Sequence, residues 1–228
     1  RTRYTMNKIL VIAPHPDDET LGCGGAILKH KSKGDKIHWL IVTAMTEDIG
    51  YTPEKIMQRS NEIQKVSKAY GFSSVHQCGF SATMLDVIPL AEIVPKIGAV
   101  IKKVKPNIVY LPFWGDVHTD HRIVFDAVSS CLKWFRSPSV NRVLAYETLS
   151  ETDAALNSAT NVFHPNVFVD ISAFLKKKIE IMRIYNNQLG SFPFPRSEEA
   201  IRAQTALRGF ASGFKAVEAF MLLKEVIE

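Results

Sequence analysis

Long hydrophobic runs are missing from this chain. No stretch reaches the about 18 consecutive apolar residues that a membrane-spanning helix needs. The start of the chain also lacks the apolar stretch and small-residue cleavage site of a secretory signal peptide. We therefore expect neither stable membrane insertion nor a cleaved leader.

Cysteine is scarce, with three residues among 228. Cys23, Cys78 and Cys131 are odd in number and far apart, which excludes the disulfide framework of a small secreted domain. Reduced thiols favour a cytoplasmic protein. We expect Cys23, close to a motif described below, to be a small buried residue rather than a thiolate ligand.

A large excess of charge is also absent. The 28 basic and 23 acidic residues give a formal charge of +5. Lysines gather late in the predicted helices, where they complement the helix dipole; attraction of an anionic substrate, such as a nucleotide-linked sugar, is the alternative. No nucleic-acid-binding motif accompanies them, so we expect no nucleic-acid partner. Residues 1–5 precede the first methionine, and we expect them to be a remnant of expression.

Apolar strand-like runs alternate with longer helical patterns along the rest of the chain. Strands are predicted at 7–13, 36–43, 74–78, 107–111, 142–146 and near 166–170. Helices are predicted at 20–33, 53–70, 89–104, 120–135, 171–188 and 198–225. The segment 191–196, S-F-P-F-P-R, is predicted to be a loop near the active rim or an oligomer contact. The alternation predicts an α/β class: one domain, 6–228, with a Rossmann-like three-layer fold and a mostly parallel sheet flanked by helices.

A polar motif stands where the first predicted strand ends. Residues 13–20 read A-P-H-P-D-D-E-T and follow the apolar run 9–12. Ligands of open α/β sheets bind beyond the carboxyl ends of the strands. Acids clustered there have no packing role, so a cation or a reaction is the better explanation.

A second motif stands at the end of another predicted strand. Residues 116–121 read D-V-H-T-D-H and follow the apolar run 108–111. Both motifs are expected on the same rim of the sheet, where His15, Asp18 and His121 supply a set of three metal ligands. Such a set with one open position is typical of catalytic zinc, and two histidines with one carboxylate can also hold iron(II).

The remaining polar residues of the two motifs suit hydrolysis of an amide. Asp17 is predicted to be the general base that takes a proton from water. His118 is predicted to stabilise the oxyanion, with Asp120 or Asp116 fixing its orientation and raising its pKa. Taken singly, each residue could instead be a helix cap or a solvated loop residue. Helix capping and loop solvation alone do not explain why two such clusters of His and Asp both stand at strand ends.

A glycine-rich turn after the first motif invites comparison with dinucleotide-binding proteins. Residues 22–27 read G-C-G-G-A-I, which puts Ile27 where the third glycine of that fingerprint belongs. The acids just before the turn would repel a pyrophosphate. A nucleotide-binding oxidoreductase is thus the weakest hypothesis, and we expect the glycines to bring the helix close to the sheet.

The two motifs together resemble the LmbE-like family, also called PIG-L, of zinc-dependent N-acetyl deacetylases. The C-terminal residues R-G at 208–209 and E-A-F at 218–220 are similar as well, so the resemblance spans nearly the whole chain from Asn7. It implies zinc as the cofactor, although Fe²⁺ or another divalent metal remains open. The implied zinc ligands are His15, Asp18 and His121.

The resemblance also implies roles for other residues. Asp17 matches the family's general base, and His118, with Asp120 as its partner, matches the oxyanion-stabilising histidine. Arg59, in R-S-N-E at 59–62, matches an arginine that binds substrate in some members; a surface ion pair with Glu62 is the alternative. Some relatives also place a tyrosine near the metal, for which this sequence offers no clear match.

The expected function is hydrolysis of an N-acetyl group from an amino sugar of the N-acetylglucosamine type, with release of acetate. Similarity over 145–148 and 166–170 to members linked to surface polysaccharides suggests a nucleotide-linked or polysaccharide-biosynthesis substrate. Two alternatives stay open: a metal-dependent amidase acting on a non-sugar molecule, and a non-catalytic metal- or sugar-binding protein. Relatives often form symmetric assemblies, so a homo-oligomer is one expectation.

Overall fold

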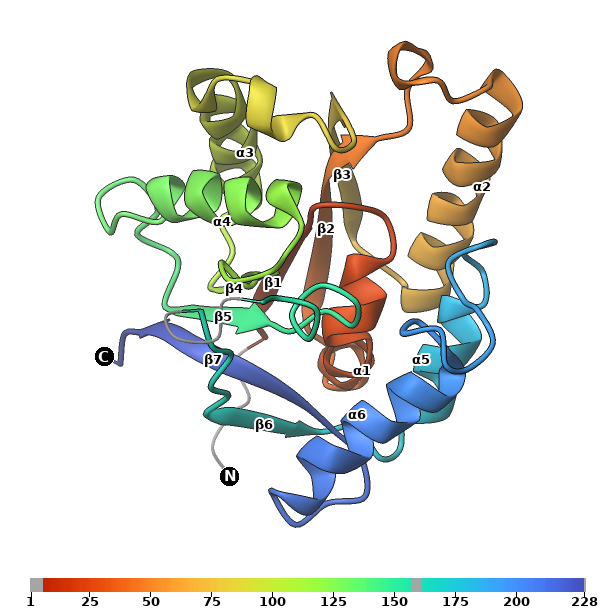
Figure 1. Cartoon of the computed structure of the whole chain (residues 1–228). Coiled ribbons are helices and arrows are strands. Elements are labelled where there is room, and N and C mark those ends of the chain that lie inside the picture. Colours follow the sequence, from red (N-terminus) through yellow and green to blue (C-terminus); the bar gives the residue numbers. More distant parts are fainter. Residues whose placement is uncertain (1–5, 157–160, 228) are drawn as a thin grey trace.

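A computed structural model of the chain describes residues 6–156 and 161–227. The expected expression remnant, 1–5, lies outside the described residues. Within them, seven strands form one sheet in the order β3-β2-β1-β4-β5-β7-β6 (Figure 1). The strands are β1 (Lys8–Ala13), β2 (Lys36–Ala44), β3 (Ser74–Ser81), β4 (Ile108–Pro112), β5 (Arg142–Tyr146), β6 (Val167–Asp170) and β7 (Val217–Glu225). The first five are mutually parallel, whereas β7 is antiparallel to both its neighbours.

Helices cover both faces of the sheet (Figure 1). They are α1 (Asp18–Ser32), α2 (Pro53–Tyr70), α3 (Leu90–Val104), α4 (Thr119–Cys131), α5 (Leu175–Met182) and α6 (Glu198–Phe210), with short 3₁₀ turns η1 (Glu47–Ile49) and η2 (Leu85–Val87). Successive β1 residues face opposite sides: Ile9 and Val11 pack with α1, α2 and α5, and Leu10 and Ile12 pack with α3 and α4. Both faces are covered, which explains the continuous apolar run in β1 and confirms the predicted three-layer α/β fold.

The glycine-rich segment 22–27 lies inside α1 and acts as a close-packing surface, as expected. A Cβ on Gly22 would lie 2.2 Å from the Tyr146 ring, and one on Gly25 would lie 2.6 Å from Ile171. Cys23 between them is buried. The glycines therefore let α1 lie against β5 and the segment before α5.

The helix predicted at 198–225 is wrong in its second half. α6 ends at Phe210, Gly213 takes a positive φ of 82°, and 217–225 forms β7. The Ala, Leu, Met, Lys and Glu content of 217–225 favours a helix locally, but pairing on both sides with β5 and β6 overrides that propensity. The helices predicted at 120–135 and 171–188 are also shorter, ending at Cys131 and Met182.

A buried ion pair supports a kink in α1. Cys23 leaves the helical conformation (φ −143°, ψ 21°), which frees backbone groups on either side of it. Glu218 of β7 accepts hydrogen bonds from the N–H groups of Gly25 and Ala26 at 2.8 and 2.7 Å. Lys178 of α5 donates to Glu218 at 2.8 Å and to the Leu21 carbonyl at 2.8 Å. Two elements distant in sequence, β7 and α5, thereby hold α1 on both sides of its kink.

Removing the cation of this pair should be costly. Lys178→Met is expected to lower the free energy of unfolding by about 3–5 kcal/mol, because Glu218 would be left as an uncompensated buried charge. Lys177→Met, which removes an exposed lysine one residue away, serves as the control and should change stability by less than about 0.5 kcal/mol. Denaturant unfolding of both variants checks this; equal stability losses would contradict it.

No helix in the described part of the chain is long and apolar enough to cross a membrane.

Candidate metal centre and active site

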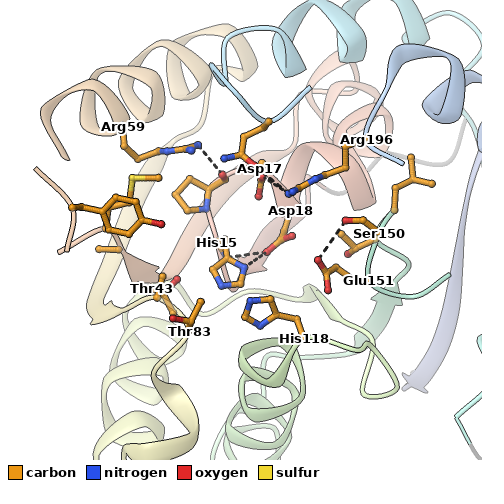
Figure 2. Close-up of a pocket in the computed structure, with 18 residues that line it drawn as sticks. His15, Asp17, Asp18, Thr43, Arg59, Thr83, His118, Ser150, Glu151 and Arg196 are labelled. Atoms are coloured by element: carbon orange, nitrogen blue, oxygen red, sulfur yellow. Dashed lines mark hydrogen bonds and ion pairs between the residues drawn. The ribbon is translucent and has the colours of Figure 1, made fainter. Parts of the chain in front are cut away.

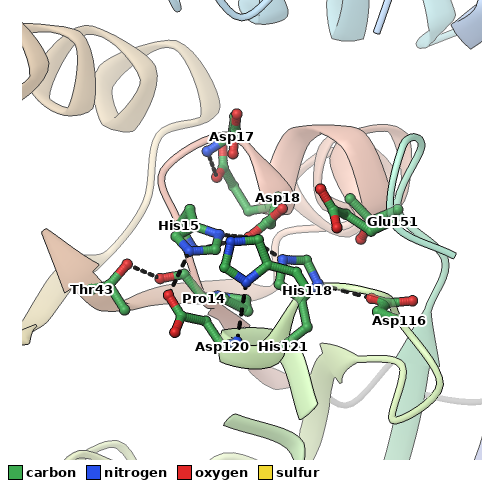
Figure 3. A network of polar contacts seen from close by, with 12 residues as sticks. Pro14, His15, Asp17, Asp18, Thr43, Asp116, His118, Asp120, His121 and Glu151 are labelled. Carbon is green, nitrogen blue, oxygen red and sulfur yellow. Dashed lines mark hydrogen bonds and ion pairs between the residues drawn. The ribbon is translucent and has the colours of Figure 1, made fainter. Parts of the chain in front are cut away.

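The two motifs meet at the carboxyl ends of neighbouring strands. β1 and β4 are adjacent and parallel, so the segments that follow them emerge at the same edge of the sheet. His15 and Asp17 lie between β1 and α1, and Asp18 opens α1. His118 caps α4, and His121 lies in its first turn. Figure 3 shows these side chains converging from both segments.

Three of them, His15, Asp18 and His121, lie together as expected for a set of metal ligands. The Oδ2 atom of Asp18 lies 3.3 Å from Nδ1 of His15 and 3.3 Å from Nε2 of His121. Ligand atoms of the three residues all lie within 4.8 Å of one another. Tetrahedral ligands about 2.0–2.1 Å from a zinc ion stand about 3.4 Å apart, so these separations fit a metal centre.

Buried carboxylates hold the other nitrogen of each imidazole. His15 Nε2 lies 2.9 Å from Asp120, and His121 Nδ1 lies 2.8 Å from Asp116 (Figure 3). Metal-binding histidines commonly carry such a carboxylate partner, which orients the ring and raises its basicity. These carboxylate partners favour a metal-binding role for the two histidines over a role as helix caps or solvated loop residues.

The charge balance of the site also suits a cation. Burial works against charge on His15, but the Asp120 and Asp18 carboxylates raise its pKa to about 9. Burial opposes charge on His121 too, and Asp18 and Asp116 nevertheless raise its pKa well above the usual value. The carboxylates thus draw positive charge to both rings. A divalent cation supplies that charge in place of the protons, as metal binding to histidine requires.

A second group of three is less suited to metal binding. His15, His118 and Asp120 also have ligand atoms within 4.8 Å of one another. However, the two Asp120 oxygens already accept hydrogen bonds from the backbone N–H groups of Thr83 (2.7 Å) and Leu85 (3.2 Å). Asp120 is therefore better suited to orienting His15 than to binding the ion.

Asp17 lies beside this centre. It lines a pocket that is also lined by His15 and Asp18 (Figure 2). Its carboxylate lies 3.5 Å from the Arg196 guanidinium. Burial, with a smaller contribution from the Asp18 charge, raises the pKa of Asp17 to about 7. A carboxyl group with a pKa near neutrality is able to accept and return a proton.

His118 differs from expectation in its partner and its pKa. The Asp120 carboxylate contacts His15, and the hydrogen bond between Asp120 and His118 instead runs from the Asp120 backbone N–H to His118 Nδ1, at 3.1 Å. Burial, together with the neighbouring charges of His15 and His121, lowers the pKa of His118 to about 4, whereas a rise was expected. Since Nδ1 accepts, the neutral ring carries its proton on Nε2.

Arg59 lines the pocket but is also engaged with the protein. It is 7% exposed, its Nη1 donates to the Pro16 carbonyl at 3.2 Å, and its Nε lies 3.4 Å from Glu62. The ion pair with Glu62 that the sequence offered as an alternative is therefore present, and it is buried rather than at the surface.

Other pocket residues were not identified from the sequence. They come from the end of β2, from loops after β2, β3 and β5, and from the loop before α6: Thr43, Tyr51, Thr83, Thr148, Glu151, Gln188 and Arg196. Arg196 ends the proline-rich segment 191–196, so the structure places that end of the loop at the active rim. Tyr51 gives the pocket a tyrosine. None of these residues stands in a motif, although a proline-rich loop ending in arginine was a usable signal.

Comparisons with known proteins identify the family of this chain. The family model described as PIG-L, GlcNAc-PI de-N-acetylase, matches residues 10–132, more than half of the chain. Diacetylchitobiose deacetylase from Thermococcus kodakarensis is 27% identical over 225 residues, which span 93% of this chain and 82% of that protein.

Solved structures share the fold. The conserved protein TT1542 from Thermus thermophilus matches with a TM-score of 0.75 and 26% identity, covering 98% of this chain and 97% of that one. GalB, the 4-carboxy-2-hydroxymuconate hydratase from Pseudomonas putida KT2440, matches with a TM-score of 0.74 and 17% identity, covering 98% of each chain. The latter likeness concerns the fold alone. With the family model matching both motifs in their order, this chain belongs to the PIG-L (LmbE-like) family.

Proposed function

We propose that this protein hydrolyses the N-acetyl group of an amino sugar, releasing acetate and a free amine. The observation that carries the proposal is the buried Asp17 carboxylate beside three converging candidate ligands, of which His15 and Asp18 line the same pocket as Asp17. Binding alone would require neither this carboxylate nor His118. Membership of the family and the likeness to a diacetylchitobiose deacetylase support the same reaction.

His15, Asp18 and His121 would hold the metal ion, for which zinc is the first choice and iron(II) the second. When bound, the ion lowers the pKa of water and polarises the acetyl carbonyl. Asp116 and Asp120 keep the two imidazoles in the orientation that the centre needs.

Asp17 acts as the proton carrier in this proposal. Its carboxylate takes a proton from the attacking water and passes it to the departing nitrogen, so the amine leaves neutral. The pKa of about 7 that burial gives this group suits both transfers. Arg196 faces the same carboxylate, with its Nη1 atom 3.5 Å from Asp17 Oδ2.

His118 stabilises the oxyanion as a neutral donor. The Asp120 N–H occupies Nδ1, so Nε2–H is left to face the pocket. Burial lowers the pKa of His118, so the ring is neutral and serves as a hydrogen-bond donor. An N–H placed where negative charge develops is a general means of lowering the barrier to acyl transfer.

Loss of this donor should slow turnover without removing the metal. His118→Ala is expected to lower kcat about 10²–10³-fold. His76→Ala, at the β3 edge of the sheet, is the control and should keep the wild-type rate. Parallel rate and elemental measurements check this, and a variant that loses its metal would make His118 a ligand instead.

The pocket suits one sugar-sized group. Its volume is about 210 Å³, below the range of about 300–1,000 Å³ for drug-sized ligands. We propose that Arg59 contacts the substrate from the wall it lines.

The unpaired thiols of Cys23, Cys78 and Cys131 accord with the proposed cytoplasmic location.

A substrate panel tests the proposal. Zinc-loaded protein is incubated with N-acetylglucosamine, diacetylchitobiose, UDP-N-acetylglucosamine and N-acetylated non-sugar amines, and acetate and free amine are measured together. Equal yields of both from a sugar are expected. Cleavage of non-sugar amides alone would support the amidase alternative, and no cleavage of any amide would contradict a deacetylase. GalB, a hydratase, shares this fold. A compound of the 2-hydroxymuconate type therefore serves as a negative control, since its hydration would release no acetate.

A further inference from the structure

The backbone of Asp17 adopts a conformation that residues with a side chain rarely take. Its φ is 140° and its ψ is −28°. Such a conformation is costly for any residue other than glycine, and it persists where surrounding contacts over-determine it. The contacts that hold Asp17 in this backbone conformation therefore also determine the direction of its carboxylate.

The peptide bond between Pro16 and Asp17 is held from both sides. Its carbonyl accepts a hydrogen bond from Arg59 Nη1 at 3.2 Å (Figure 2). Its N–H donates to Glu19 Oε2 at 3.0 Å. Rotation of this peptide would break both hydrogen bonds. The side chains of Arg59 and Glu19 therefore fix the orientation of the peptide that precedes Asp17.

Tyr185, which follows α5, contacts both of these side chains. Its hydroxyl donates to Glu19 Oε1 at 2.8 Å, and its ring lies 5.5 Å from the centre of the Arg59 guanidinium. Glu19 is fully buried, and its Oε1 also accepts from the Thr20 hydroxyl at 2.5 Å. With donors on both oxygens, Glu19 is held against the Asp17 N–H and does not reach the pocket.

We propose that Glu19, Arg59 and Tyr185 form a peptide clamp that positions the Asp17 carboxylate for proton transfer. They are positioning residues, since they act through the Pro16–Asp17 peptide. The metal ligands do not need the clamp: Asp18 is oriented by His15 and His121, and His15 by Asp120. The inference rests on the proposed role of Asp17 as base.

Tyr185→Phe tests the clamp, because it removes one hydroxyl and leaves the buried ring. Small displacements of catalytic groups can cost about 10²-fold in rate, so we expect kcat to fall about 10- to 100-fold with KM and metal content unchanged. Tyr110→Phe is the matched control. Tyr110 is also buried, and its hydroxyl bonds to His30 at the opposite end of the sheet. It should keep the wild-type kcat even if its melting temperature falls equally.

A readout that does not involve activity accompanies the rates. Crystal structures of zinc-loaded wild type and Tyr185→Phe should show Asp17 φ shifted in the variant, or its N–H separated from Glu19. This comparison is valid even if the wild type hydrolyses none of the sugars, which would defeat the proposed function separately. If Tyr185→Phe does not fold, Glu19→Gln, which keeps the shape of Glu19, takes its place. Wild-type kcat with an unmoved Asp17, or a kcat that falls in proportion to lost metal, overturns the clamp.

Discussion

Replacing Asp17 by asparagine is expected to lower kcat about 10²–10⁴-fold while leaving the metal bound. The amide has nearly the shape of the carboxylate but cannot accept a proton from water, and general base catalysis is worth about this much. The ligand atoms of His15, Asp18 and His121 are untouched by the change. Steady-state rates and elemental analysis on the same preparation measure both parts of the prediction.

Asp86→Asn is the matched control for this variant. Asp86 is exposed in η2, outside the residues that line the pocket, so the same chemical change there should leave kcat as in the wild type. An Asp17→Asn enzyme that turns over at the wild-type rate would remove Asp17 as the base. One that loses its metal would place Asp17 among the ligands.

Replacing Asp18 by alanine is expected to remove the metal and, with it, nearly all turnover. The Asp18 carboxylate is the group that both imidazoles face, at 3.3 Å each. Its loss leaves two neutral ligands and no negative charge in the first coordination sphere, where three protein ligands are typical of catalytic zinc. Elemental mass spectrometry on protein purified without added metal measures the loss directly.

Asp126→Ala, on the exposed side of α4, controls for the removal of a carboxylate from the same region. It should retain as much metal as the wild type. Full metal occupancy in Asp18→Ala would break the assignment of the ligands, whatever its activity.

The layered fold was predictable because its determinants are local and regular. Buried parallel strands require continuous apolar runs, and β1 and β4 show them clearly. The C-terminal strand was not predictable in this way. Residues 217–225 favour a helix by composition, and their strand state comes from pairing with β5 and β6, which are distant in the sequence.

The centre of the site was predictable for a related reason. His15, Asp18 and His121 belong to two short motifs that each follow an apolar run, so parallel strand ends bring them together. The residues around the centre come from scattered loops. Tyr185 carries no local signal, since it gains its partner Glu19 through the tertiary fold. Arg196 gains its contact with Asp17 in the same way, and only the proline-rich loop that it ends offered a signal. Glu151 joins the pocket from the loop after β5 and stands in no motif.

The error about His118 has the same origin. One of its sequence neighbours, Asp120 or Asp116, was expected to fix its orientation and raise its pKa. In the fold, those carboxylates point to His121 and His15, and the α4 backbone occupies His118 instead. Spacing along the chain placed the residues in one site but could not decide which carboxylate faces which ring.

Metal content and acetate release, measured on the same samples as stripped protein is reloaded with zinc, test the central claim most directly. The substrate is the N-acetyl sugar that the panel identifies. We expect the rate of acetate release to rise in proportion to bound zinc and to level off at one ion per chain. Full activity in the metal-free protein, or a loaded centre that releases no acetate from any N-acetyl sugar, would contradict a metal-dependent amino-sugar deacetylase.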